Sequence, residues 1–132
     1  FKPVEVENIL DHYMHKEYIE IDEKTAERLN NYKKNWKNII AVWTTSVRTL
    51  ESFSDENWFL LHGNKDTSIF IYPWYKWKFV DSLITNFHLP QSTLLMLVSS
   101  PGWIENIQKA YLHGIENKYR FFSFWDAMWI KK

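Results

Sequence analysis

The sequence predicts an α/β fold, with helices layered on a mostly parallel sheet in a single domain over residues 1–132. Two observations support this fold class. Short apolar runs typical of buried strands alternate with segments whose apolar residues have helical spacing. The chain of 132 residues is also long enough to bury one sizeable core, and it contains no internal repeat and no interdomain linker.

The first half of the chain predicts a strand, a helix and then a strand–turn–helix unit. Asp22 is a suitable N-cap residue just before a segment with helical spacing, and an apolar run at 38–42 is typical of a buried strand. The expected elements are a strand over 18–21, a helix over 23–34, a strand over 38–42, a helix over 44–53 and a polar loop over 54–66.

The second half predicts more strands, with two helices before the last of them. Pro73 closes one apolar run, and Pro101-Gly102 separates two helical segments. The expected elements are strands over 68–72, 77–80 and 83–87, a helix opened by 90–93, a helix over 104–117 and a strand over 119–124.

Composition restricts the classes of function. Acidic and basic residues balance at 16 each, so a role in binding nucleic acid would require a local basic patch. The absence of cysteine excludes disulfides and thiolate metal sites. No apolar run approaches the roughly 20 residues of a membrane span, and no signal peptide opens the chain. We therefore expect a cytoplasmic protein without a membrane partner.

Two residue counts are unusual. Glycine occurs only 3 times, although it normally makes up about 7% of residues, and tryptophan occurs 8 times. Glycine supplies positive φ and close backbone approach in turns. The chain therefore makes its turns by other means, or other residues have replaced its glycines.

The strongest local signal is a cluster of hydroxyl groups at the start of the predicted helix over 44–53. Thr44 and Thr45 lie beside the free N–H groups of the first turn, which are suited to binding a phosphate or carboxylate. Arg48, one turn further on, can add a bidentate contact to the anion. The alternative is structural: a threonine caps the helix and Arg48 pairs with Glu51.

A second cluster contains His12, His15 and Glu17. Two histidines and a carboxylate are possible metal ligands, but residues 12 and 15 of an extended segment point to opposite faces, which opposes a metal site. Acid–base chemistry or substrate contact is the better supported interpretation, because histidine titrates near neutral pH.

Further polar side chains follow the predicted strand over 83–87. Asn86 and His88 lie at the end of this strand, where ligands bind in open α/β sheets. The structural alternative is that His88 only satisfies backbone groups of the loop. Asp126 is interpreted either as an N-cap residue or as a carboxylate in a pocket.

Together, these segments resemble the S-adenosylmethionine:tRNA ribosyltransferase-isomerases of queuosine biosynthesis. The resemblance covers essentially the whole chain and corresponds to the C-terminal portion of such enzymes. The matching motifs are Phe1-Lys2-Pro3-Val4, His12-x-Met14-His15-x-Glu17, Ala41-Val42-x-Thr44 through Glu51, Ile69 through Pro73, Val80 through Val98 and Tyr119 through Met128.

The resemblance implies a transferase and isomerase that acts on tRNA. Such enzymes transfer the ribosyl group of S-adenosylmethionine to 7-aminomethyl-7-deazaguanine in the anticodon, forming epoxyqueuosine and releasing adenine and methionine. S-adenosylmethionine is then a substrate, and no metal or other cofactor is implied. The implied catalytic residues are His15, Glu17 and His88, and the implied substrate-binding residues are Thr44, Thr45, Arg48, Asn86 and Asp126.

The departures from the family pattern are tryptophans. Trp43, Trp74 and Trp125 stand where the family carries glycine, and we expect them to fill or wall off the substrate pocket. Trp103 stands in a segment where Ala-Gly is usual, Trp77 replaces Phe, and Trp129 replaces Leu. Together with truncation to a C-terminal portion, these residues are expected to impair catalysis.

An alternative function follows from the same substitutions. The chain would be an engineered, non-catalytic fragment or scaffold whose tryptophans fill the core or bind a designed protein partner. A homodimer is a further expectation, because truncation exposes strand edges that can pair.

Overall fold

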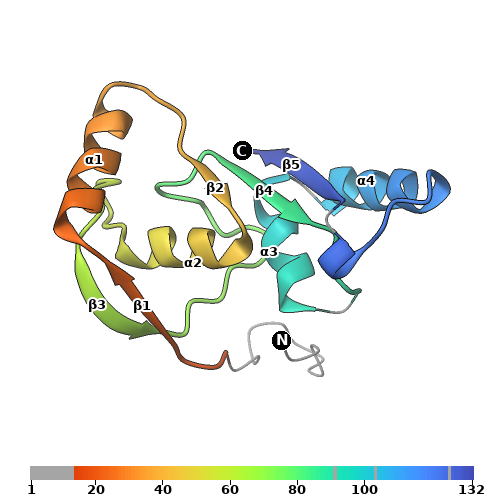
Figure 1. Ribbon diagram of the computed structural model, residues 1–132, viewed down its shortest axis with the longest axis horizontal. Helices are drawn as coiled ribbons and strands as arrows, with labels where there is room; N and C mark the ends of the chain where they lie inside the picture. The colour runs from red at the N-terminus through yellow and green to blue at the C-terminus, as the bar shows by residue number, and fades with distance from the viewer. Residues whose placement is uncertain (1–13, 91, 103, 125) are drawn as a thin grey trace.

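The computed structural model describes residues 14–90, 92–102, 104–124 and 126–132 (Figure 1). Its elements in chain order are β1 (Glu17–Ile21), α1 (Glu23–Lys34), β2 (Ile40–Val42), α2 (Thr44–Phe53), β3 (Gly63–Thr67), β4 (Ser82–Asn86), α3 (Thr93–Gly102), α4 (Ile104–Glu116), the 3-10 turn η2 (Phe122–Phe124) and β5 (Ala127–Lys131). None of these helices has the length and apolar character that crossing a bilayer requires.

The strands form two separate sheets rather than one mostly parallel sheet. β2 pairs with β4 in parallel, β4 pairs with β5 antiparallel, and β1 pairs with β3 antiparallel. The α/β class is therefore correct and the mostly parallel sheet is wrong. Along the chain, α2 and β3 lie between the parallel strands β2 and β4, and α3, α4 and η2 lie between the antiparallel strands β4 and β5.

The helices, and the strands predicted over 18–21, 38–42 and 83–87, lie close to their observed positions. Asp22 caps α1 as expected, since its carboxylate accepts the Thr25 N–H at 2.9 Å and the Thr25 hydroxyl at 2.6 Å. The predicted loop over 54–66 was wrong in its last part, which belongs to β3. The predicted strands over 68–72, 77–80 and 119–124 are also wrong, because none of these segments lies in a strand.

The residues mistaken for strands are apolar because they fill the core from irregular segments. Ile71, Trp77, Phe79 and Val80 are all buried, although none of them lies in a sheet. Apolar character reports burial, and burial does not require a hydrogen-bonded ladder. In this part of the chain the apolar pattern therefore indicates buried residues but not strands.

A buried carboxylate from α2 satisfies the backbone of one of these irregular segments. Glu51 accepts the N–H groups of Lys78 at 2.7 Å, Phe79 at 3.0 Å and Val80 at 3.0 Å, as well as the Tyr75 hydroxyl at 3.3 Å. The Glu51 carboxylate thus accepts the backbone hydrogen bonds of residues 78–80 that a neighbouring strand would otherwise accept. Burial, together with the charge of Glu51, raises the pKa of Tyr75.

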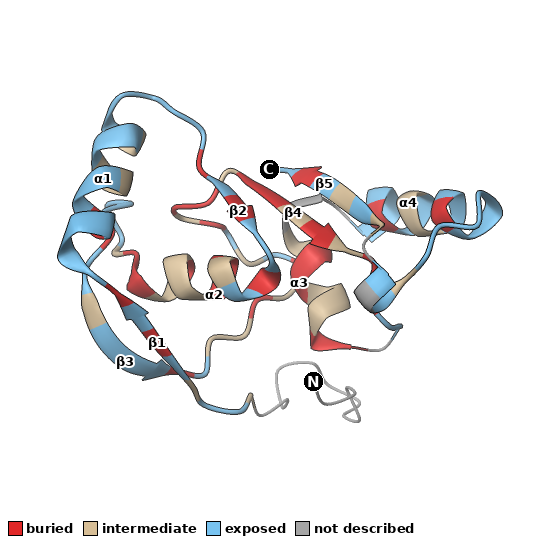
Figure 2. Ribbon diagram, viewed as in Figure 1, coloured by how far each residue is buried: buried red, intermediate tan, exposed pale blue. Residues whose placement is uncertain are grey.

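The main core lies between one face of the β2–β4–β5 sheet and three helices. Ala41, Leu83 and Ile130 share that face and pack with residues of α2, α3 and α4, namely Val47, Leu97, Val98 and Ile107. A second core cluster lies among β1, α1 and the end of α2. Figure 2 shows the buried positions concentrated along β4 and the adjoining helices, whereas α1 is mostly exposed.

Candidate functional site

The parallel pair of strands brings two polar segments together at one edge of the sheet. Val42 is in register with Ile84, and the next N–H group, that of Trp43, donates to the Ile84 carbonyl at 2.9 Å. The N-terminus of α2 therefore lies beside the carboxyl end of β4. On the other side of β4, Asn86 is in register with Ala127, so Asp126 lies at the same end of the sheet.

The N-terminus of α2 carries the predicted hydroxyl groups, but they do not cap the helix. Trp43 is the N-cap residue and makes no side-chain capping hydrogen bond, while Thr44 and Thr45 are the first residues of the helix itself. The capping alternative is therefore wrong. Thr44 is buried and Thr45 is exposed, so Thr45 is the hydroxyl that a ligand can reach.

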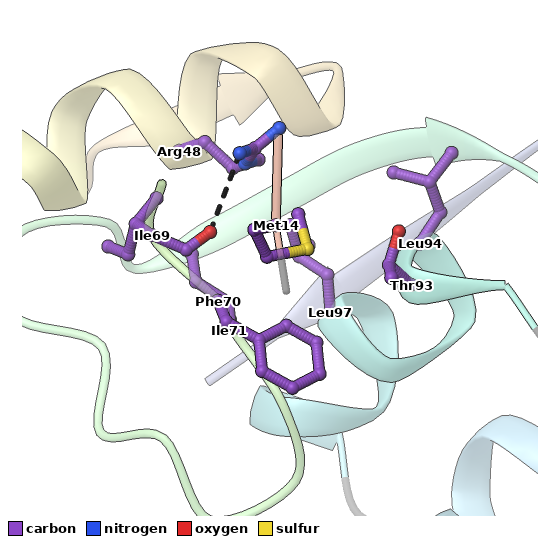
Figure 3. Close-up of a pocket in the computed structure, with 8 residues that line it drawn as sticks. All are labelled: Met14, Arg48, Ile69, Phe70, Ile71, Thr93, Leu94 and Leu97. Carbon is purple, nitrogen blue, oxygen red and sulfur yellow. Dashed lines mark hydrogen bonds between the residues drawn. The ribbon is translucent and has the colours of Figure 1, made fainter. Parts of the chain in front are cut away.

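Arg48 is paired with a different residue from the one expected. Its Nη1 lies 2.5 Å from Glu17 Oε2, and its Nη2 donates to the Ile69 carbonyl at 3.5 Å (Figure 3). The predicted pair with Glu51 is wrong, because Glu51 binds the backbone of residues 78–80 instead. Arg48 is only 5% exposed, and within the described residues its buried Nε has no hydrogen-bond partner.

The guanidinium of Arg48 borders a small cavity beneath α2. Met14 from the segment before β1 and Leu97 from α3 line this cavity (Figure 3). The cavity encloses about 10 Å³, and its remaining lining residues are Ile69, Phe70, Ile71, Thr93 and Leu94. This volume is about that of one water molecule, so the space beside Arg48 is closed to a substrate in this arrangement.

His88 is held in a buried and uncharged environment after β4. Its Nε2 lies 3.1 Å from the Thr85 hydroxyl, and its backbone N–H donates to the Tyr111 hydroxyl at 2.8 Å. Burial lowers the pKa of His88 to about 4. The imidazole is therefore neutral near pH 7, where it can accept a proton or donate a hydrogen bond but does not supply charge.

Asn86 and Asp126 both organise the loop that leads into β5. The Asn86 side-chain amide donates to the Phe122 carbonyl. Asp126 accepts the Arg120 backbone N–H at 2.5 Å and pairs with its guanidinium at 3.3 Å. The hydrogen bond from Arg120 lowers the pKa of Asp126. The N-cap interpretation of Asp126 is wrong, because a strand follows it.

The histidine cluster is only partly described. His15 is exposed just before β1, two residues from Glu17, and His12 lies outside the described residues. Among the residues that the structure describes, no three His, Cys, Asp or Glu side chains are placed to hold a metal ion. Glu17 is joined to α2 through its ion pair with Arg48.

The tryptophans do not share one environment. Trp77 is buried, and its indole N–H donates to the Ser100 hydroxyl at 2.7 Å, whereas Trp74 is 78% exposed. Trp43 is partly exposed at the N-terminus of α2, and Trp129 is exposed on β5. Trp103 and Trp125 lie outside the described residues. Core filling therefore describes Trp77 alone among the tryptophans that can be assessed.

Sequence reasoning missed two residues that define the environment of His88. Thr85 was available as a signal, because it lies three residues before His88 at the end of the same strand. Tyr111 had no such signal, since it reaches His88 from α4 only through the tertiary packing. The fold and these side chains define an α/β domain with a candidate ligand site at the carboxyl ends of its parallel strands.

Comparison with known proteins then identifies the family. A family model described as queuosine biosynthesis protein matches residues 1–130, so the chain belongs to this family. It is 53% identical over 131 residues to the S-adenosylmethionine:tRNA ribosyltransferase-isomerase of Acetivibrio thermocellus, which covers 99% of this chain. The resemblance inferred from the motifs is confirmed.

A solved structure supports the same relationship. The chain is similar to the S-adenosylmethionine tRNA ribosyltransferase of Thermotoga maritima, with a TM-score of 0.76 and 41% identity over 84% of this chain. The chain spans 38% of the length of the A. thermocellus protein and 39% of the T. maritima chain. Neither relative is described as a binding scaffold.

Proposed function

We propose that this chain forms part of an S-adenosylmethionine:tRNA ribosyltransferase-isomerase. In this reaction the ribosyl group of S-adenosylmethionine is transferred to 7-aminomethyl-7-deazaguanine in tRNA and isomerised. Membership of the family is the observation that carries the proposal. The grouping of the α2 N-terminus, Asn86 and His88 at one edge of the sheet supports it, because ligands of α/β sheets bind at such edges.

The end of α2 is proposed to bind the anionic part of a substrate. Thr45 is exposed at the first turn, where the helix dipole and free N–H groups favour a carboxylate or phosphate. Thr44 stands behind it as a buried hydroxyl. Arg48 would contribute a positive charge to this anion site if the substrate displaced Glu17 from the Arg48 guanidinium.

The end of β4 is proposed to contact the ribosyl or deazaguanine part. His88 is neutral near pH 7 and its Nε2 lies 3.1 Å from the Thr85 hydroxyl, so it would contact the substrate as an uncharged hydrogen-bonding group. Asn86 would donate or accept hydrogen bonds from the sheet edge, and Asp126 would hold the neighbouring loop. His15 or Glu17 would carry the proton to solvent.

The experiment is an adenine-release assay of the whole enzyme that contains this chain, with S-adenosylmethionine and a tRNA anticodon stem-loop bearing 7-aminomethyl-7-deazaguanine. We expect stem-loop-dependent release of adenine, and a loss of about tenfold to a hundredfold in Thr45→Val, because a hydroxyl donor to the anion is removed. Thr49→Val, one turn further along the same helix, is the matched control. Equal rates in the two variants would remove the α2 terminus from the proposed site.

A further inference from the structure

Several tryptophans have a backbone conformation that suits glycine. Among the described non-glycine residues, φ is positive at the four tryptophans Trp36 (57°), Trp43 (73°), Trp58 (62°) and Trp74 (80°), and otherwise at Lys118 (57°) and Phe122 (62°). A residue with a Cβ adopts positive φ uncommonly, and for a bulky side chain it is a genuine outlier. Glycine adopts such angles about as readily as negative ones. Chance placement of tryptophan does not explain why these four residues share this property.

Trp36 occupies the position at the end of α1 where glycine is most strongly preferred. Asn35 is the C-cap residue of α1, so Trp36 is the first residue beyond it. Its N–H donates to the Lys33 carbonyl at 3.0 Å, and the Lys37 N–H donates to the Tyr32 carbonyl at 3.0 Å. These two bonds form a Schellman motif, whose left-handed residue is usually glycine.

Trp74 occupies the corresponding position of a tight turn. The Tyr75 N–H donates to the Tyr72 carbonyl at 2.9 Å, with Pro73 and Trp74 between them. Proline followed by a residue of positive φ is the pattern of a type II turn, in which the third residue is normally glycine.

Trp43 and Trp58 show the same mismatch at two further turns. At φ 73° and ψ 150°, Trp43 lies in a region of backbone space that is essentially restricted to glycine. Trp58 closes a turn in which its N–H donates to the Asp55 carbonyl at 3.3 Å. At both positions the backbone adopts a positive φ that is unfavourable for a residue with a Cβ.

The side chains at these four positions are all exposed. Trp36, Trp58 and Trp74 are 94%, 62% and 78% exposed, and Trp43 is 41% exposed. Trp77 behaves differently, because it is only 3% exposed and its N–H is hydrogen-bonded to Ser100. Trp129 lies in β5 with the Lys131 ammonium 4.3 Å from its ring centroid. The described tryptophans therefore fall into two groups, the four at positive φ and the two, Trp77 and Trp129, that lack it.

We infer that positions 36, 43, 58 and 74 are glycine positions, and that the polypeptide made in the native cells of this protein carries glycine at all four. One codon read as tryptophan here and decoded as glycine by those cells would produce the whole pattern. Separate substitutions would have had to select the largest side chain repeatedly at left-handed sites. The scarcity of glycine, with 3 residues in the chain, has the same origin.

The consequence for the site concerns position 43. Glycine there removes the indole from the N-terminus of α2 and lets a ligand approach the N–H groups of the first turn. This consequence rests on the proposed function, whereas the identity of the residue does not. The chemical identity and the activity can therefore be tested separately.

The first test is peptide mapping by mass spectrometry of the protein isolated from its native cells. Peptides that cover positions 36, 43, 58 and 74 are expected to contain glycine, and those that cover positions 77 and 129 are expected to contain tryptophan. Tryptophan at the four left-handed positions would overturn the inference. Adenine release plays no part in this measurement, so a failure of the proposed activity would leave its result intact.

The second test measures the backbone preference in recombinant protein. The variant W36G/W43G/W58G/W74G is expected to melt roughly 10 °C higher or more, because the strain at each position is released. Trp77→Gly is the matched control and is expected to melt lower, since it empties a buried site. A melting temperature of the fourfold variant that is unchanged or lowered would overturn the conformational basis of the inference.

Discussion

The buried imidazole of His88 predicts that the protein loses stability in mild acid. Burial lowers the pKa of His88 from its ordinary 6.5 to about 4. The unfolded chain therefore binds a proton at this residue between these two pH values, whereas the folded chain does not. The free energy of unfolding contributed by His88 is fully present above the unfolded pKa and is lost as the pH falls toward 4.

The size of this effect follows from the pKa difference. Each pKa unit corresponds to about 1.4 kcal/mol, so the full shift amounts to roughly 3 kcal/mol. Between about pH 7 and pH 5 the expected loss is roughly 2 kcal/mol. No other group is needed to produce a loss in that interval, since most carboxylates titrate below it.

Urea denaturation at several pH values measures the loss directly. The parent protein is expected to become less stable from about pH 7 to pH 5, and His88→Gln is expected to flatten this dependence, since glutamine does not titrate. His113→Gln, at an exposed position on α4, is the matched control and should keep the parental slope. A parental slope in His88→Gln would refute the assignment of the effect to His88.

Two further predictions concern Glu51 and Lys33, whose charged side chains hold the irregular segment that includes Phe79. Glu51→Gln is expected to lower the free energy of unfolding in denaturant by about 2–4 kcal/mol, because an amide nitrogen would face backbone N–H groups. Glu56→Gln, at an exposed position, is the control and should change it little. Equal losses in the two variants would contradict this role for Glu51. Lys33→Met is expected to lose about 1–2 kcal/mol in the same assay, because its ammonium bonds both Asp81 and the Phe79 carbonyl, and an unchanged midpoint would contradict it.

The parts of the fold that were predictable are those set by local sequence. The α1 boundaries follow from the Asp22 cap and from helical spacing, and the α2 start follows from the apolar run before it. The β3 strand could not be predicted, because residues 63–67 are polar and are held by antiparallel pairing with β1. The direction of β5 depends on how α3 and α4 pack, which no short window of sequence contains.

The candidate site was predictable in its residues but not in their partners. Arg48 and Glu51 are three residues apart on one helix, so a local pair was a reasonable expectation. In the structure both side chains instead bind groups distant in the sequence, which are Glu17 for Arg48 and the 78–80 backbone for Glu51. A buried charge takes the partner that the tertiary fold supplies, because an unpaired charge in the core costs far more than a lost helix pair.

The contact between Arg48 and Glu17 leads to a prediction that separates two roles of Glu17. If Arg48 binds the carboxylate of methionine, Glu17 competes for the same guanidinium, because its Oε2 lies 2.5 Å from Nη1. Glu17→Gln is then expected to bind methionine several times more tightly in a calorimetric titration, while losing roughly 1–2 kcal/mol of stability. Unchanged or weaker binding would leave Glu17 as a proton carrier alone and would remove Arg48 from the carboxylate site.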